Sequence, residues 1–579
     1  MNYTKARKNP TTFLALTSVS ISLFDEILPF FTEAHDEYFR WHDVKGNKVA
    51  RKRSHTIQSN SPLPTVSERL FFILVYLKNN PLQSYHAACF DMSQQQCGQW
   101  IHTLTEILRN SIEDAGMLPA SDVVAFRRLL DELGGDAVVH ELIHDGTERE
   151  IPRPSDPDLQ KEHYSGKKNQ ILGEARAIRA FLYFDMVRLW GHIPLFTEPS
   201  SENREQADPK DVYALIFSHL KFGMENIPAD AYTSADDFGR ITKYACEAIL
   251  ARAYLFYNGY MGGDPATVEG TTITKSDALA ACEDVIASGR YKLVPEFKNL
   301  WPAASLVPLP DGEIGWDPEK STYAGDANSE VILCQMFTPT QDYNGNNDSN
   351  RWLVNIGMRS VNWSPYGKGW GIATISPNYY SSLYTTNDGR RVASVIDMAG
   401  EGVTASPDFA NAQKDWREYT GYMNKKYTPL VFGNNSTPAT NPDGTGDFMI
   451  TNAQTWVIMR YADVLLMAAE LGSGNGGAYL DQVRSRAGLG QMALNQQNIM
   501  AERARELAYE GVRYWDLLRQ GVEVMADAVC ASAGPVLNGG NEAQVSYDRA
   551  QIIRTKGLSQ IPYNQITLSH GVLKQNEGW

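Results

Sequence analysis

Apolar residues recur every three or four positions along most of the chain, on both sides of a long stretch without such a pattern. This spacing predicts two sets of helices. They cover residues 171–189, 211–226, 243–257 and 275–288, then 456–471, 477–487 and 498–519. Alanines occupy close-packing positions in the helices of the first set. Paired helices of about 15 residues with alternating small and aromatic positions predict tetratricopeptide-like hairpins.

Residues 290–440 differ from both helical blocks. They are rich in Gly, Asn, Trp and Tyr and lack helical periodicity, which predicts short strands joined by loops. The last segment, 557–579, is expected to be loop and extended chain. The fold class predicted from these patterns is mainly α, with helical hairpins and a loop-rich, short-strand subdomain.

The first 120 residues contain a helix-turn-helix pattern. A capped apolar helix over 62–80 precedes a short helix at 81–90, a two-residue turn and a second helix over 94–108. The second helix leads with glutamines, so Gln95, Gln96 and Gln99 are candidate readers of base edges or phosphates. The alternative is an ordinary polar helix surface.

A basic stretch lies upstream of this pattern. Residues 45–55 hold five Lys or Arg in eleven positions, and Arg51, Lys52 and Arg53 are candidate phosphate contacts. The alternative here is a solvated loop. The net charge of -15 argues against nonspecific nucleic-acid binding by the chain as a whole.

The composition changes near residue 169. Eight of the 11 histidines precede this position, whereas ten of the 12 tryptophans follow it. The net charge is -3 before it and -12 after it. One domain rarely changes composition so sharply, so we expect a junction between two unrelated parts.

The cysteines and the N-terminus limit the function classes. The six cysteines have no metal-ligand spacing and are expected to be core residues, so we predict neither a metal nor a cofactor. An apolar run at 11–24 follows basic residues but no cleavage site or lipidation cysteine follows it. We therefore expect no signal peptide, amphipathic helices instead, and a cytoplasmic location for the chain as written. No run approaches the ~18 apolar residues of a membrane span.

The irregular region is the candidate ligand site. Sugar rings have apolar faces that stack on flat aromatic side chains, with nearby polar groups binding the hydroxyls. The predicted ligand-binding residues are Trp352, Trp363, Tyr366 and Trp370. The alternative is that these rings fill the core of the loop-rich subdomain.

Charged residues crowd the last helical block. They recur at spacings of three, four and seven, which predicts interhelical ion pairs and caps. The positions are Arg484, Arg486, Glu502, Arg503, Glu506, Glu510, Arg513, Asp516 and Arg519. A catalytic acid/base pair at Glu506 and Glu510 is the alternative, but two carboxylates on one arginine-rich helix face do not flank a cleft. We predict no enzyme activity.

Several segments of the second part resemble the SusD/RagB family of outer-membrane nutrient-binding lipoproteins. The matching sequences are GEARAIRAFLYFDMVRLWGHIPLFTEP at 173–199, GRITKYACEAILARAY at 239–254, WVIMRYADVLLMAAE at 456–470, LDQVRSRAGL at 480–489, AERARELAYEGVRYWDLLR at 501–519 and QIPYNQITLSHGVLKQNEGW at 560–579. The resemblance implies a non-catalytic glycan-binding protein at the outer membrane. It also implies a SusC-type TonB-dependent transporter as partner and an oligosaccharide or other nutrient as ligand.

The first part resembles the start of a DDE-type insertion-sequence transposase. The resemblance rests on LPTVSERLFFILVYLKNNPLQSYHAACFDMSQQQCGQWIH at 63–102 and LIHDGTEREIPRPSDPDLQKEHYSGKK at 142–168. It implies that Asp145 is the first metal-binding carboxylate of a nuclease site. Such a site needs several carboxylates around two Mg²⁺ ions, and the resemblance ends before the others. Asp145 is therefore expected to be an orphan without transposase chemistry.

Together these observations predict a fusion of two partial proteins, divided into three segments. Residues 1–120 form a helix-turn-helix domain, residues 121–169 are the truncated start of a nuclease domain and the junction, and residues 170–579 are a SusD/RagB-like domain without its N-terminal part. Insertion of a mobile element into a SusD-type gene would produce this order. The function expected is glycan binding, impaired by the lost N-terminus. The alternatives are a DNA-binding transposase remnant, acting through residues 1–120, and a nonfunctional gene fusion.

Overall fold

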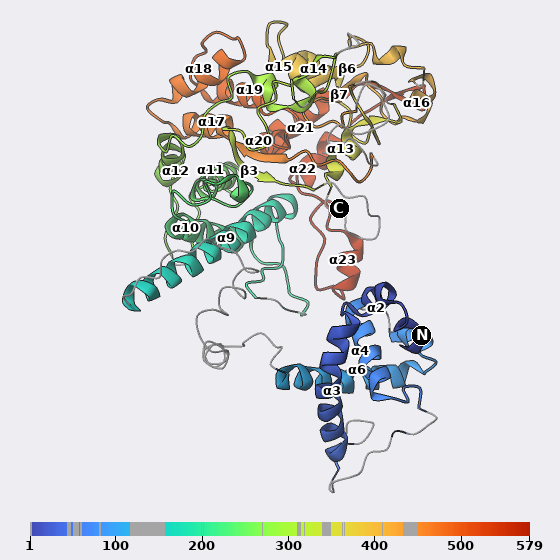
Figure 1. Cartoon of the computed structure of the whole chain (residues 1–579). Coiled ribbons are helices and arrows are strands. Elements are labelled where there is room, and N and C mark those ends of the chain that lie inside the picture. The colour runs from blue at the N-terminus through green and yellow to red at the C-terminus, as the bar shows by residue number, and fades with distance from the viewer. Residues whose placement is uncertain are drawn as a thin grey trace. The chain divides into compact units, whose positions relative to one another are not determined.

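The computed structural model of the chain divides into two compact units, Met1–Pro152 and Arg153–Trp579. The structure describes residues 3–42, 48–49, 57, 61–79, 83–115, 157–198, 200, 202–268, 270–309, 314–317, 319–338, 349–361, 363, 365–407, 409–431 and 448–579. Each unit has its own apolar core. The two units are described separately below (Figure 1).

Apart from short loops, the described residues of the N-terminal unit are helical. Its helices are α1 (Tyr3–Ala6), α2 (Pro10–Thr17), α3 (Ile21–Trp41), α4 (Val66–Asn79), α5 (Gln83–Cys89) and α6 (Gln94–Asp114). Asn9 and Ser20 cap α2 and α3 through side-chain oxygens, as short polar residues do at helix starts. The predicted amphipathic helices at 11–24 are therefore present, and α3 packs on α6.

Among the described residues, no single helix is long and apolar enough to cross a membrane. The bent pair α2 and α3 passes that test only when the two are counted together, by length and composition.

The C-terminal unit begins with a stack of helices in which each packs on the next. The stack consists of α9 (Pro157–Trp190), α10 (Pro209–Asn226), α11 (Lys243–Tyr260), α12 (Lys275–Ala287), α17 (Tyr461–Leu471), α18 (Gly476–Arg486) and α19 (Gln496–Glu506). The four helices that precede the irregular region are joined to the three that follow it where α12 contacts α17. The mainly α prediction is thus confirmed.

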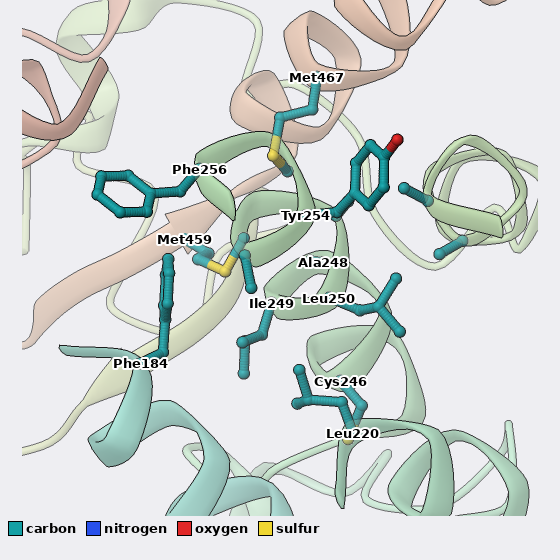
Figure 2. Close-up of a cluster of buried hydrophobic side chains, with 14 of the residues drawn as sticks. Phe184, Leu220, Cys246, Ala248, Ile249, Leu250, Tyr254, Phe256, Met459 and Met467 are labelled. Carbon is teal, nitrogen blue, oxygen red and sulfur yellow. The ribbon is translucent and has the colours of Figure 1, made fainter. Parts of the chain in front are cut away.

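Small residues let these helices approach closely around α11. Phe184 from α9, Leu220 from α10 and Met467 from α17 converge on α11 in Figure 2. A Cβ added at Gly223 of α10 would lie 2.7 Å from the sulfur of Cys246 on α11. That contact is too short for any side chain, so glycine is required where α10 crosses α11.

Helix α9 has apolar residues on two opposite faces. Ala177, Phe184 and their neighbours are buried against α10 and α11, whereas Ile178 and Leu182 are exposed. The helix also runs without a break through residue 169, where the composition changes. A helix that is apolar on both sides is usually enclosed by packing partners.

The irregular region contains two-stranded pairs rather than a large sheet. The antiparallel pairs are β1 (Val307–Pro308) with β2 (Ile314–Gly315), β3 (Val331–Gln335) with β8 (Trp456–Arg460), and β6 (Val395–Asp397) with β7 (Tyr422–Asn424); β4 (Met358–Arg359) and β5 (Lys368–Gly369) are parallel. Short helices α13 (Arg351–Ile356), α14 (Pro377–Leu383), α15 (Arg390–Ser394) and α16 (Phe409–Asp415) separate them. This region is the loop-rich subdomain that the sequence predicts.

Several predicted boundaries were wrong, among them the start of the helix predicted over 171–189, since α9 begins at Pro157. Residues 456–460 are strand β8 rather than helix, because this aromatic and β-branched run pairs with β3. The helix predicted over 498–519 breaks after α19, because Tyr509 and Gly511 adopt positive φ angles of 65° and 77°. The C-terminal segment, expected to be extended, contains the short helix α23 (Tyr563–Leu568).

The rest of the C-terminal unit completes this arrangement. It comprises α20 (Arg513–Leu518), α21 (Val522–Ser532), the hairpin β9 (Pro535–Asn538) and β10 (Asn541–Gln544), and α22 (Arg549–Arg554).

Candidate functional site

Trp352 is the outermost ring of an aromatic column at the start of α13. Asn350 caps this short helix, since its Oδ1 accepts the backbone N–H of Trp352 at 3.0 Å. The Trp352 ring lies 5.8 Å from Trp456, which stacks on the buried Tyr427 at 4.1 Å. Trp352 is nevertheless 52% exposed. The column therefore holds a large aromatic surface in place at the protein–water boundary.

Trp370 joins this surface through its backbone. Its N–H donates to the carbonyl of Val354 on α13 at 2.7 Å, and the N–H of Ile372 donates to the carbonyl of Asn355 at 2.8 Å. Trp370 is 38% exposed and Ile372 is 68% exposed. We call Trp352, Trp370 and Ile372 the aromatic surface.

The other two predicted ligand residues lie inside. Tyr366 is 2% exposed and belongs to the core of the irregular region, against which the half-buried Trp363 packs. The Tyr366 hydroxyl donates to Glu401, and burial followed by this carboxylate raises its pKa well above the ordinary value. The structure thus exposes Trp352 on α13 and Trp370 on the segment bonded to α13, while Tyr366 supports the core and exposes no ring face.

Sequence reasoning missed Ile372 and Trp456. Trp456 lay in a predicted helix, and nothing in its local pattern marks it as the support of Trp352. Ile372 is a single exposed aliphatic residue, which is too common on protein surfaces to be a signal by itself.

The helix-turn-helix pattern is built from α5 and α6. Gln95 is exposed at the start of α6, and Gln99 is partly exposed one turn later. Gln96 has a different role, because its Oε1 accepts the backbone N–H of Ser93 at 3.2 Å while Ser93 Oγ accepts the N–H of Gln96. This reciprocal capping box engages the Gln96 side chain. His102, exposed two turns after Gln95, extends the same face and was not predicted.

Four further candidates lie outside the described residues. They are Arg51, Lys52, Arg53 and Asp145.

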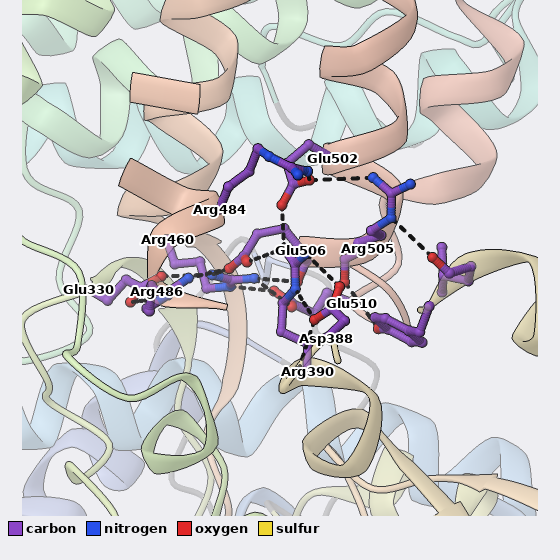
Figure 3. Close-up of polar contacts among 12 residues, drawn as sticks. Glu330, Asp388, Arg390, Arg460, Arg484, Arg486, Glu502, Arg505, Glu506 and Glu510 are labelled. Carbon is purple, nitrogen blue, oxygen red and sulfur yellow. Dashed lines mark hydrogen bonds and ion pairs between the residues drawn. The ribbon is translucent and has the colours of Figure 1, made fainter. Parts of the chain in front are cut away.

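The charged residues of the last helical block form a buried ion-pair network (Figure 3). Eight of the nine predicted positions make ion pairs, and Arg513 is the exception among the described residues. Glu506 lies at the centre and contacts Arg390, Arg460 and Arg486. Burial alone would raise the pKa of Glu506, yet the three guanidinium groups hold it well below its ordinary value. A carboxylate held in this way is a structural anion rather than a proton donor.

The irregular region supplies the partners of these helices. Arg390 lies between Asp388 and the α19 residues Glu502 and Glu506. Lys426 donates to Glu510 at 2.6 Å, and burial lowers the pKa of this lysine to about 8. The network therefore connects α18 and α19 to the subdomain that carries the aromatic surface.

No cluster of three or more His, Cys, Asp or Glu side chains suited to a metal ion is present among the described residues. Of the six cysteines expected in the core, Cys97, Cys246, Cys282 and Cys334 are buried, whereas Cys89 and Cys530 are only partly buried.

Family comparisons match three segments of the chain. Residues 329–579 match the SusD family, residues 156–255 match a SusD-like family described as starch-binding and associating with the outer membrane, and residues 61–114 match the helix-turn-helix of DDE superfamily endonucleases.

The chain is also similar to individual SusD-like proteins. SusD-like protein P2 of Formosa agariphila is 25% identical over 386 residues, which cover 61% of this chain and 65% of that protein. The chain thus spans slightly less than two thirds of the length of this curated relative.

Solved structures share the fold. A laminarin-binding SusD-like protein superposes with a TM-score of 0.53 at 24% identity, covering 80% of this chain and 86% of its own. Surface glycan-binding protein A from Bacteroides thetaiotaomicron, in complex with laminarihexaose, superposes with a TM-score of 0.52 at 22% identity, covering 72% and 79%. By these comparisons residues 156–255 and 329–579 are similar to SusD-like and SusD proteins, and residues 61–114 are similar to the helix-turn-helix of DDE superfamily endonucleases.

Proposed function

We propose that the C-terminal unit binds an oligosaccharide at the aromatic surface, as a non-catalytic accessory protein of nutrient uptake. The observation that carries the proposal is the exposure of Trp352 and Trp370 on one rigid support. Two solved neighbours are named for laminarin and laminarihexaose, which supports a carbohydrate as the class of ligand.

The geometry suits a sugar ring. Trp352 offers an apolar face whose position is set by Trp456 behind it, so little side-chain entropy is lost on binding. Arg359 adds a polar group at the edge, because its Nη1 donates to the carbonyl of Trp370 at 3.0 Å. Aromatic anchors with a few placed polar groups are typical of specific small-ligand sites.

The proposal extends to partner and location through the similarity to SusD proteins. A SusC-type TonB-dependent transporter would receive the ligand at the outer membrane.

Replacing both Trp352 and Trp370 by alanine should weaken oligosaccharide binding at least tenfold, because both stacking faces are removed. Affinity electrophoresis of the full chain against a polysaccharide panel that includes laminarin measures this loss. Trp41→Ala is the matched control, since Trp41 is comparably exposed but lies in the N-terminal unit. Equal retardation of the double variant and the unchanged protein would refute the aromatic surface as the site.

A second candidate function is DNA binding by the N-terminal unit. It is favoured by the endonuclease-type match at 61–114 and by the exposed face of α6. Gln95 and Gln99 lie one turn apart on that face, near the N-terminus of α6. In helix-turn-helix proteins, the N-terminal residues of the second helix contact the base edges.

The full chain should therefore shift duplex DNA carrying transposon terminal inverted repeats, and less so as salt rises. Gln95→Ala combined with Gln99→Ala should reduce the preference for the repeats over random DNA. Gln497→Ala, an exposed glutamine of the C-terminal unit, serves as control. Absence of any shift at low salt would exclude this function.

A further inference from the structure

A groove lies beside the β9–β10 hairpin, apart from the residues of the aromatic surface. It encloses about 670 Å³, a size typical of small-ligand sites. Its lining comes from three distant segments of the chain: Pro377, Tyr419, Thr420, Pro535, Val536, Leu537, Glu542, Ala543 and Gln544.

One face of the hairpin alternates apolar and polar side chains. Leu537 pairs with Glu542 across the strands, and Pro535 pairs with Gln544. Side chains of directly opposed residues project to the same face, so these four residues form two adjacent apolar–polar pairs. Val536, which points to the other face, is buried.

Tyr419 is fixed at the edge of the groove. Its backbone exchanges two hydrogen bonds with Leu537, at 2.8 and 2.9 Å, and its ring stacks on the buried Trp416 at 4.8 Å. The preceding residue, Glu418, adopts a positive φ of 52°. Asn538 holds that conformation, since its Oδ1 accepts the Glu418 N–H at 2.6 Å. A non-glycine residue in this backbone region is uncommon and is often found at binding sites.

The chemistry of the lining selects a class of ligand. None of the described lining residues is Lys or Arg, and Glu542 contributes a carboxylate, so the groove disfavours anions. An aromatic ring, apolar prolines and leucine, and the hydrogen-bonding groups of Thr420, Glu542 and Gln544 together suit a ligand with apolar ring faces and many hydroxyls. A neutral saccharide has both.

We propose that this groove is a second carbohydrate subsite, which takes a neutral oligosaccharide against Tyr419 with Glu542 and Gln544 as hydroxyl partners. The inference rests on the proposed glycan-binding function and extends it to a surface separate from the aromatic surface. Two subsites on one chain would raise the avidity for a polysaccharide without new contacts at either site.

The experiment uses calorimetric titration of the full chain with neutral oligosaccharides, laminarihexaose among them. Glu542→Ala combined with Gln544→Ala removes the polar partners, and both side chains are exposed, so the fold should survive. Asn541→Ala is the control on the same hairpin outside the lining. We expect the groove variant to weaken binding about fivefold or more, and the control to change nothing.

The aromatic-surface variant separates this proposal from the proposed function. With Trp352 and Trp370 both replaced by alanine, residual binding should persist and should disappear when the groove substitutions are added. Loss of all binding in the tryptophan variant, with no effect of the groove variant, overturns the groove and leaves the proposed function standing. If only the groove variant loses oligosaccharide binding, the result supports the groove as a site and overturns the aromatic surface. Absence of binding by the unchanged chain to every neutral oligosaccharide overturns both.

Discussion

Replacing Arg460 by methionine should lower the free energy of unfolding of the C-terminal unit by about 3–5 kcal/mol, the cost of removing one partner from a buried ion pair. Arg460 is almost completely buried and donates to three carboxylates (Figure 3). Its Nη1 reaches Glu330 at 2.7 Å and Glu506 at 2.6 Å, while Nε donates to Glu510 at 2.8 Å. Without Arg460, buried carboxylates of different segments face one another with too little positive charge.

The loss should diminish as the pH falls, because the stranded carboxylates take up protons and no longer need a counter-charge. Glu506 keeps Arg390 and Arg486, whereas Glu510 keeps only Lys426 among its described ion pairs.

Denaturant unfolding followed by tryptophan fluorescence measures this effect, since ten of the 12 tryptophans lie after residue 169. Arg549→Met is the matched control, because the Arg549–Asp527 pair is exposed to water. Exposed pairs contribute little, so this control should leave the unfolding midpoint unchanged. An Arg460 variant as stable as the control would show that the network does not stabilise the unit.

The helical part of this network could be predicted from spacing, but its other half could not. Residues three, four and seven apart on one helix are neighbours whatever the fold, which is why the charges of α18 and α19 were recognised. Their partners Glu330, Asp388 and Arg390 come from the irregular region. No periodicity connects those segments to the helices, and only the tertiary structure brings them together.

The candidate ligand site shows the same division. Aromatic composition pointed to the irregular region, but composition does not distinguish a buried ring from an exposed one where no helix or strand sets the direction of the side chains. Trp352 became exposed because Asn350 starts a helix there, whereas Tyr366 forms a bridge with Trp363 and turns into the core. Gln96 was assigned to DNA for its residue type, yet its position three residues after Ser93 makes it a capping residue.

A buried carboxyl group makes the stability of the C-terminal unit depend on pH. Burial, and then the nearby Asp284 carboxylate, raise the pKa of Glu247 on α11 to about 8. Lys243 opposes this shift from 3.3 Å but is closer to Asp284, at 2.5 Å, which holds the pKa of Asp284 below its ordinary value. Among the described residues, Glu247 Oε2 has no hydrogen-bond partner.

Replacing Glu247 by glutamine should therefore stabilise the unit by about 3 kcal/mol at pH 7 and have little effect near pH 4.5. The folded state of the unchanged chain binds more protons at Glu247 than the unfolded state does, so its stability falls as the pH rises from about 4.5 through 8. Glutamine keeps the shape of the protonated acid without the charge, and Lys243 retains Asp284 as its partner.

Unfolding titrations at several pH values between 4.5 and 8.5 test this prediction, with Glu225→Gln as the control because Glu225 is exposed on α10. The Glu225 control should keep the pH dependence of stability of the unchanged chain. The Glu247 variant should lose the fall in stability above pH 4.5 that Glu247 causes. If the stability of the two variants falls to the same extent as the pH rises, Glu247 is ionised in the folded state at little cost in free energy. In that case Lys243 is shared between the two carboxylates, and the contact between α11 and α12 stabilises a charged glutamate instead of a neutral one.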